Sequence, residues 1–180
     1  MSAAMFTGSA SLTLAGALFA LLLAVACVTD VRERRIPNSV ILALLVLGIG
    51  VSEVRAPGWP AVAGALGGVA VGLALWLPFW LLRVVGAGDV KLFAAASAWL
   101  GPLQAVEGAL LTALFGGAVA ILFMLRGRGV AFTLVRLAHA ASQPQILRDG
   151  PETARSGRLP YALAIAAGVS TAAWWPGILL

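Results

Sequence analysis

Long apolar segments, separated by short polar or glycine- and proline-containing stretches, set the pattern of this chain. The six segments cover about Ala10–Val28, Ile36–Val51, Trp59–Leu82, Val90–Leu100, Leu103–Leu125 and Tyr161–Leu180. A helix that crosses a bilayer needs about 20 apolar residues, with a lower limit of about 17. The first, third, fifth and sixth segments meet this length, whereas the second and fourth are shorter. The pattern therefore predicts an all-α polytopic membrane protein with six transmembrane helices.

The composition of the chain points to the same class of protein. Of the 180 residues, 61% are hydrophobic and 11% are charged, which lies far outside the range of soluble domains. We expect one membrane-embedded domain over residues 1–180, surrounded by the lipid bilayer. The net charge of +5 would suggest nucleic-acid binding in a soluble protein. Here the cations lie between apolar segments, where they mark cytoplasmic loops, so no nucleic-acid partner is expected.

The distribution of lysine and arginine predicts the orientation of the chain. With the N-terminus outside, the inner loops hold 11 of the 12 cations, and the outer connections hold only Arg55. This asymmetry is the positive-inside pattern of a multi-pass membrane protein. The inner cations are Arg32, Arg34, Arg35, Arg83, Lys91, Arg126, Arg128, Arg136, Arg148, Arg155 and Arg158. Residues 126–159 are expected to form a cytoplasmic loop with a short interfacial helix over Val130–Ala141.

Two aspartates lie beside apolar segments on the same predicted side. Asp89 follows Gly86-Ala87-Gly88 at the start of the fourth segment, and Asp30 follows the first segment. A carboxylate is costly inside a membrane, so an acid there indicates a functional site. The roughly 11 residues from Val90 to an expected outer turn at Gly101-Pro102 would rise about 16 Å, half of the hydrocarbon core. Asp89 is therefore expected below the inner surface, beside a water-filled cavity.

Two such acids have the chemistry of an aspartic protease. Adjacent carboxylates cannot both ionise cheaply, so one keeps a proton while the other is anionic. The anion takes a proton from water as the water attacks a peptide carbonyl, and the neutral acid stabilises the oxyanion and protonates the leaving amine. Which aspartate starts in which role stays open, because the pair titrates as a unit. Gly86 and Gly88 can adopt positive φ and let a substrate backbone approach Asp89.

Each aspartate also has a structural interpretation. Asp89 would be a good N-cap for a helix that starts at Val90. Asp30 could be an ordinary interfacial acid balanced by Arg32 or Arg34. Because the two acids lie on one predicted side, each beside an apolar segment, we favour the catalytic interpretation of the pair.

Other polar residues are candidates for a supporting role. Lys91 either lines the cavity or extends to the aqueous boundary, as lysines near the ends of spans do. Asn38, at the start of the second segment, is a candidate hydrogen-bonding residue near the pair. Tyr161 starts the last segment and is equally well explained as an interfacial aromatic anchor. Since Cys27 and His139 are the only cysteine and histidine, no metal and no cofactor is expected.

Small residues recur in the third segment. Gly64, Gly68 and Gly72 form small-xxx-small pairs, which let helices approach closely. We expect them to pack inside the bundle, and a homodimer formed through these glycines stays open as the alternative.

Three stretches resemble the signature sequences of the type IV prepilin peptidases, aspartyl proteases of the bacterial inner membrane with a G-x-G-D motif. They are residues 30–38 (DVRERRIPN), residues 86–92 (GAGDVKL), and residues 158–161 (RLPY) with Ala164, Ile165, Ala166 and Gly168. The resemblance covers nearly the whole chain. It implies removal of the short basic leader from prepilins, on the cytoplasmic side of their hydrophobic N-terminal helix, with Asp30 and Asp89 as the catalytic pair.

One departure from the family pattern narrows this expectation. Longer members carry an insertion with paired C-x-x-C motifs after the first span and also N-methylate the new N-terminus. Here Val31–Asn38 leaves no room for it and Cys27 is alone. The chain thus resembles the short form associated with tight-adherence (Flp-type) pili, and only peptidase activity is expected. The alternatives are a non-enzymatic proton-coupled transporter or pilus-assembly subunit, and a preflagellin- or presenilin-like protease with another substrate.

Overall fold

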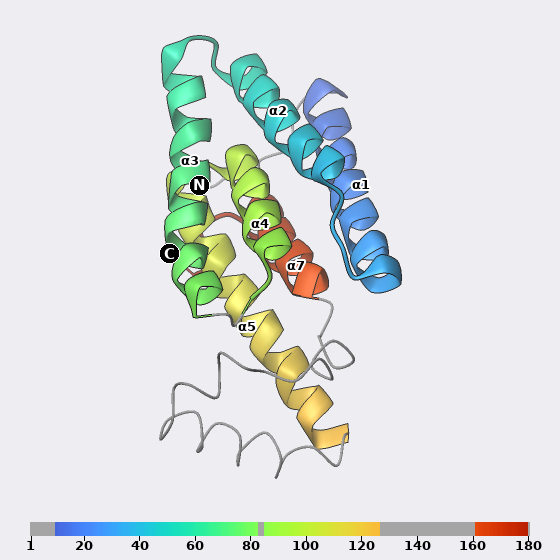
Figure 1. The fold of residues 1–180 in the computed structure, drawn as a ribbon. Helices are drawn as coiled ribbons and strands as arrows, with labels where there is room; N and C mark the ends of the chain where they lie inside the picture. Colours follow the sequence, from blue (N-terminus) through green and yellow to red (C-terminus); the bar gives the residue numbers. More distant parts are fainter. Residues whose placement is uncertain (1–9, 83–84, 127–160, 180) are drawn as a thin grey trace. The chain divides into compact units, whose positions relative to one another are not determined.

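The described part of the chain is entirely helical. A computed structural model of the protein describes residues 10–82, 85–126 and 161–179, and these contain no strand. They form six helices, one for each predicted apolar segment (Figure 1). The helices are α1 (Ala10–Glu33), α2 (Asn38–Arg55), α3 (Trp59–Leu81), α4 (Ala87–Leu100), α5 (Pro102–Arg126) and α7 (Tyr161–Trp174).

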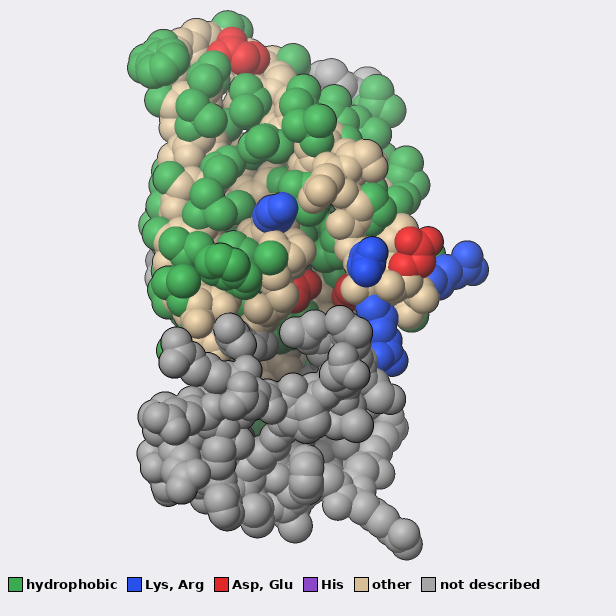
Figure 2. Space-filling view, viewed as in Figure 1, with side chains coloured by type: hydrophobic (Ala, Val, Ile, Leu, Met, Phe, Trp, Pro, Cys, Tyr) green, Lys and Arg blue, Asp and Glu red, His purple; other side chains and the backbone are tan. Residues whose placement is uncertain are grey.

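Several of these helices are suited to a membrane. Four are long and apolar enough to cross one: Thr13–Glu33, Asn38–Arg55, Trp59–Leu81 and Pro102–Val119. The apolar helix α7 is shorter, and α4 has 14 residues. Large apolar side chains are exposed, including Leu14 at 71% and Trp59 at 75%. Figure 2 shows such side chains over most of the described surface on one face. The chain is therefore a polytopic all-α membrane protein, as predicted.

The chain divides into two compact units. Met1–Phe115 with Pro160–Leu180 forms the first, and Gly116–Leu159 forms the second. Every contact discussed below lies within the first unit. The interfacial helix expected over Val130–Ala141 and nearly all of the loop expected at 126–159 lie outside the described residues. The single-domain expectation and the orientation of the chain stay predictions.

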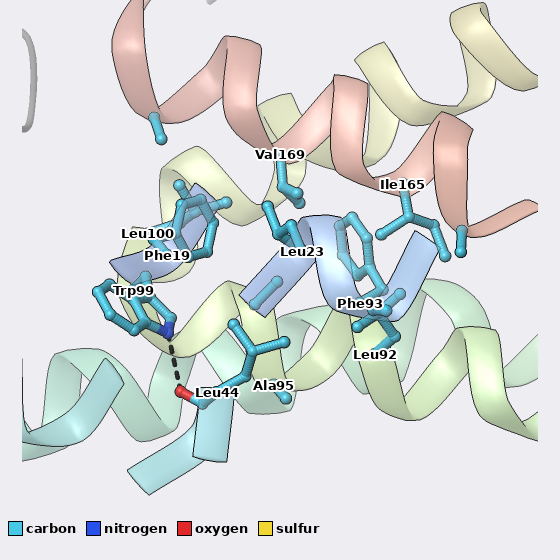
Figure 3. Packing of buried hydrophobic residues seen from close by; sticks show 14 of the residues in the cluster. Phe19, Leu23, Leu44, Leu92, Phe93, Ala95, Trp99, Leu100, Ile165 and Val169 are labelled. Carbon is cyan, nitrogen blue, oxygen red and sulfur yellow. Dashed lines mark hydrogen bonds between the residues drawn. The ribbon is translucent and has the colours of Figure 1, made fainter. Parts of the chain in front are cut away.

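Helix α4 forms the centre of the first unit. Every residue from Leu92 to Leu100 is buried. Helices α2, α3 and α7 pack against α4, whereas α1 packs on α2 and α7. Large side chains span the space between α1 and α4, because the rings of Phe19 and Trp99 lie 4.9 Å apart (Figure 3). The two helices thus meet through side chains within the core.

Small residues bring α3 close to α4. A side chain added at Gly68 would collide with the backbone carbonyl of Ser97, and one at Gly72 would lie 3.1 Å from the Cα of Ala94. The expectation of packing inside the bundle is confirmed for these two glycines. Gly64 has nothing within 4 Å of such a position. Because lipid is as apolar as the helix surfaces, this close van der Waals contact is a main source of helix association.

A tight turn ends α4 where the sequence predicted it. Gly101 is the C-cap of α4 with φ 79°, and α5 begins at the next residue, Pro102. Glycine adopts this left-handed conformation without strain, and proline suits the first position of a helix. The turn fixes the far end of α4 and therefore the place of its N-terminus.

Substitution of two glycines one turn apart tests the packing of α3 on α4. Gly68→Ala should destabilise the protein by about 1–3 kcal/mol, because the methyl group overpacks a backbone contact. Gly64→Ala should leave stability unchanged or raise it slightly, since alanine favours helix and meets open space. Thermal unfolding in detergent measures both. Equal stability of the two variants would contradict this packing.

Candidate active site

Asp89 lies in the first turn of α4. The helix begins at Ala87 with Gly86 as its N-cap, so Asp89 is the third helical residue. Oδ2 of Asp89 accepts a hydrogen bond from the N–H of Gly86 at 3.1 Å. The prediction that Asp89 is the N-cap of a helix starting at Val90 is therefore wrong. The carboxylate still caps the backbone N–H of Gly86 at the positive end of a helix.

The glycines beside Asp89 have ordinary backbone conformations. Gly86 has φ −76° and ψ 152°, and Gly88 lies inside the helix. Among the described glycines, positive φ occurs at Gly58, Gly101 and Gly177. The expectation of positive φ at Gly86 and Gly88 is thus wrong. The lack of a side chain at Gly86 leaves space for the Asp89 carboxylate, because a Cβ there would lie 3.1 Å from Oδ2 of Asp89.

Asp30 lies in the last turns of α1 and contacts the start of α7. Its Oδ2 accepts a hydrogen bond from the backbone N–H of Ala162 at 3.3 Å. Ala162 is the second residue of α7, where backbone donors lack partners within the helix. The Asp30 carboxylate therefore satisfies one of these donors and lies at the positive end of α7. Both aspartates are partly buried, so both keep some access to solvent.

One electrostatic interaction and one packing contact connect the surroundings of the two acids. Tyr161, the neighbour of Ala162, interacts electrostatically with Asp89. On the other side, Ile36 follows α1 and packs over Gly88, because a Cβ there would lie 3.7 Å from its side chain. The structure thus gathers both aspartates at one end of the bundle, where α1 ends and α4 and α7 begin.

The chain between α1 and α2 is short and strained. Arg34, Arg35, Ile36 and Pro37 alone connect the two helices. Arg34 has φ 52°, and its N–H donates to the backbone carbonyl of Asp30 at 2.9 Å. A left-handed conformation costs a non-glycine residue roughly 1–2 kcal/mol. This turn ends α1 just after Asp30 and directs Ile36 onto α4, a feature that sequence patterns did not reveal.

The other predicted residues lie near this end of the bundle but are exposed. Lys91 is an exposed residue between the buried Val90 and Leu92 of α4, and Asn38 is the exposed first residue of α2. Their supporting roles stay predictions. Tyr161 is only partly exposed, and its ring packs edge-on against Trp76 at 5.5 Å. It is therefore part of the core as well as the start of a span.

A further acid within the bundle lies outside the site. Glu107 of α5 is only 2% exposed, and its two carboxylate oxygens accept the N–H groups of Gly177 at 2.9 Å and Leu179 at 3.0 Å. These bonds hold the segment that follows α7, at the opposite end of that helix. Buried and satisfied by backbone donors, Glu107 has a structural role. Within the described residues, no group of three or more His, Cys, Asp or Glu could hold a metal ion.

Comparison with known proteins gives the family of the chain. Residues 17–121 match the model of the Type IV leader peptidase family. The prepilin leader peptidase/N-methyltransferase of Dickeya chrysanthemi is 34% identical over 169 residues, which cover 88% of this chain and 54% of that protein. The proteins of the same name from Burkholderia pseudomallei (strain K96243) and Klebsiella pneumoniae are 35% and 34% identical, over 69% and 56% of this chain.

The chain spans about half the length of these curated relatives, with 42% of the Burkholderia protein and 46% of the Klebsiella protein covered. No solved structure matches. The family match nonetheless covers more than half of the chain and includes Asp30 and Asp89. This all-helical membrane chain, with two acids at one end of its helix bundle, thus belongs to the Type IV leader peptidase family.

Proposed function

We propose that the protein is an aspartic endopeptidase that removes the basic leader from type IV prepilins, with Asp30 and Asp89 as the catalytic pair. The observation that carries the proposal is that packing gathers both acids at one end of the bundle. Ala162 at the start of α7 donates a hydrogen bond to Asp30, and Ile36, which follows α1, packs on Gly88 beside Asp89. Asp30 and Ala162, which are 132 positions apart in sequence, thus lie within hydrogen-bonding distance. Membership of the family supports prepilins as the substrate class.

The reaction needs only the two acids and water. One aspartate is anionic and takes a proton from water as the water oxygen bonds to the scissile carbonyl carbon. The other is neutral and donates a hydrogen bond to the carbonyl oxygen as negative charge develops there. When the tetrahedral intermediate collapses, the C–N bond breaks and the leaving amine receives its proton from the neutral acid, so that the two aspartates have exchanged protonation states. No cofactor takes part, and either aspartate can start as the base.

The charge pattern supports cleavage at the cytoplasmic face of the bacterial inner membrane. Arg32 and Arg35 flank the α1 end of the site, as expected for residues at an inner surface. The substrate's hydrophobic helix would remain in the bilayer beside the apolar surface of the bundle. Its basic leader would lie in the cytoplasm, so the bond to be cut would be at the depth of the two acids.

A narrower form of the proposal concerns the second activity named in the relatives. The short α1–α2 connection, Arg34 to Pro37, leaves no space for an inserted domain at that point. We therefore expect a peptidase of the Flp-type pilus class without N-methyltransferase activity. Mass spectrometry of the processed pilin, made with S-adenosylmethionine present, would show an unmodified N-terminus. A product heavier by one methyl group would contradict this part.

Two single substitutions test the catalytic pair. Asp30→Asn and Asp89→Asn should each lower cleavage at least about 100-fold, since an amide neither accepts the proton from water nor donates one as an acid. Each amide keeps an oxygen that can accept the N–H of Ala162 or Gly86, so folding should persist. Loss of the leader from a purified prepilin, followed on gels, measures cleavage. Normal processing by both variants would end the proposal.

Two further variants serve as controls for that experiment. Glu33→Gln removes an exposed acid three residues after Asp30 and should cleave at the wild-type rate. Asp89→Ala removes the acceptor for the Gly86 N–H as well as the acid. It should lower the stability of the protein by roughly 0.5–2 kcal/mol, whereas Asp89→Asn should not. The comparison separates the helix-capping function of Asp89 from its chemistry.

Substitution of Gly88 tests whether a substrate approaches α4 at its first turn. A methyl group at Gly88 would make only ordinary contact with Ile36, and alanine favours helix by about 1 kcal/mol over glycine. Gly88→Ala should therefore keep or raise the unfolding temperature while cleavage falls about 10-fold or more, because a misplaced substrate loses reactivity steeply. Gly50→Ala, in open space on α2, should likewise keep or raise the unfolding temperature but leave cleavage unchanged. Wild-type cleavage by Gly88→Ala would show that substrate does not need this space.

A further inference from the structure

We infer that the α7 start, Tyr161 and Ala162, sets the separation of the two acids, and that Tyr161 and Cys27 are positioning residues for the reaction. The inference deepens the proposed function and rests on it. The inference concerns what holds Asp30 near Asp89. The helices that carry these acids, α1 and α4, face each other through large side chains. Neither Tyr161 nor Cys27 has a role in the chemistry described above.

On the Asp30 side, two side chains of α1 bind the backbone N–H and carbonyl groups of Ala162. The N–H of Ala162 donates to Oδ2 of Asp30, and the Sγ–H of Cys27 donates to the carbonyl oxygen of Ala162 at 3.4 Å. Cys27 and Asp30 are three residues apart, so they lie on the same face of α1. Ala162 itself has no exposed surface. The start of α7 is thus held against α1 by two bonds in opposite directions.

On the Asp89 side, an aromatic group joins α7 to α4. The ring of Tyr161 packs edge-on against Trp76 of α3, at 5.5 Å and an interplanar angle of 69°. Trp76 packs in turn on Phe93 of α4 at 5.3 Å. Phe93 follows Asp89 by four residues, so both lie on one face of α4. Tyr161 is thereby linked through Trp76 to the face of α4 that carries Asp89, and the Asp89 carboxylate acts electrostatically on its hydroxyl.

The two sides are coupled because Tyr161 and Ala162 are consecutive residues of one helix. A displacement of the α7 start moves the hydrogen bond to Asp30 and the aromatic packing toward α4 together. A thiol is a weak donor, so its bond adds little stability. The thiol instead affects the positions of the catalytic groups. A reaction among two acids, water and a peptide is sensitive to those positions.

The test compares substitutions that keep shape and remove one polar group. Tyr161→Phe keeps the ring and removes the hydroxyl, and Cys27→Ala removes the thiol. Each should lower kcat for leader removal roughly 10-fold while KM and the unfolding temperature stay near wild type. Cys27→Ser restores a hydroxyl donor and should recover most of kcat. Leu163→Ala, a neighbouring exposed position on α7, should behave as wild type.

The outcomes separate this inference from the proposed function. Wild-type kcat in both Tyr161→Phe and Cys27→Ala would overturn the inference and leave the peptidase intact. A loss of kcat matched by a loss of unfolding temperature, without rescue by Cys27→Ser, would also overturn it, because the residues would then be merely structural. No cleavage by the wild-type protein would overturn the proposed function and this inference with it.

Discussion

The burial of α4 on all sides is the constraint on which the rest of the structure depends. A helix of 14 residues, with every position from Leu92 to Leu100 buried, has no face for lipid. Its neighbours must therefore surround it, and α3 achieves the required approach by presenting Gly68 and Gly72. Since the turn at Gly101 fixes one end of α4, the other end begins within the bundle. Asp89 is carried to that end, where its side chain is partly buried.

The three acids described within the bundle are all stabilised by hydrogen bonds from backbone N–H groups. Asp30 and Asp89 each accept a hydrogen bond from a backbone N–H group at the start of a helix, where such donors lack helical partners. Glu107 accepts two from the segment that follows α7. The three differ in exposure. Glu107 is sealed from solvent, whereas Asp30 and Asp89 remain partly open. An intramembrane carboxylate is thus no sign of catalysis by itself, and partial exposure distinguishes the two candidates from the structural acid.

The sequence was sufficient for the elements but not for the contacts between them. Apolar length and glycine or proline boundaries predicted all six helices, and positive-inside charge put both acids on one side. Local patterns placed the start of α4 too late, because Gly86 to Gly88 suggested a break where Gly88 continues a helix. The left-handed turn at Arg34 and the contact of Ala162 with Asp30 depend on packing between distant segments. No periodicity within one segment encodes such contacts.

The arrangement has a consequence for how the acids are held together. At the far end of the bundle, the Phe19–Trp99 pair sets the spacing of α1 and α4. At the near end, the spacing depends on Ile36 over Gly88 and on the α7 start. Both near-end contacts belong to segments that follow a connection, and not to the centre of a buried helix. The separation of the acids therefore depends on contacts made at helix ends and not in the middle of α4. One of these ends is itself anchored in the core, because Ala162 has no exposed surface and Tyr161 packs on Trp76.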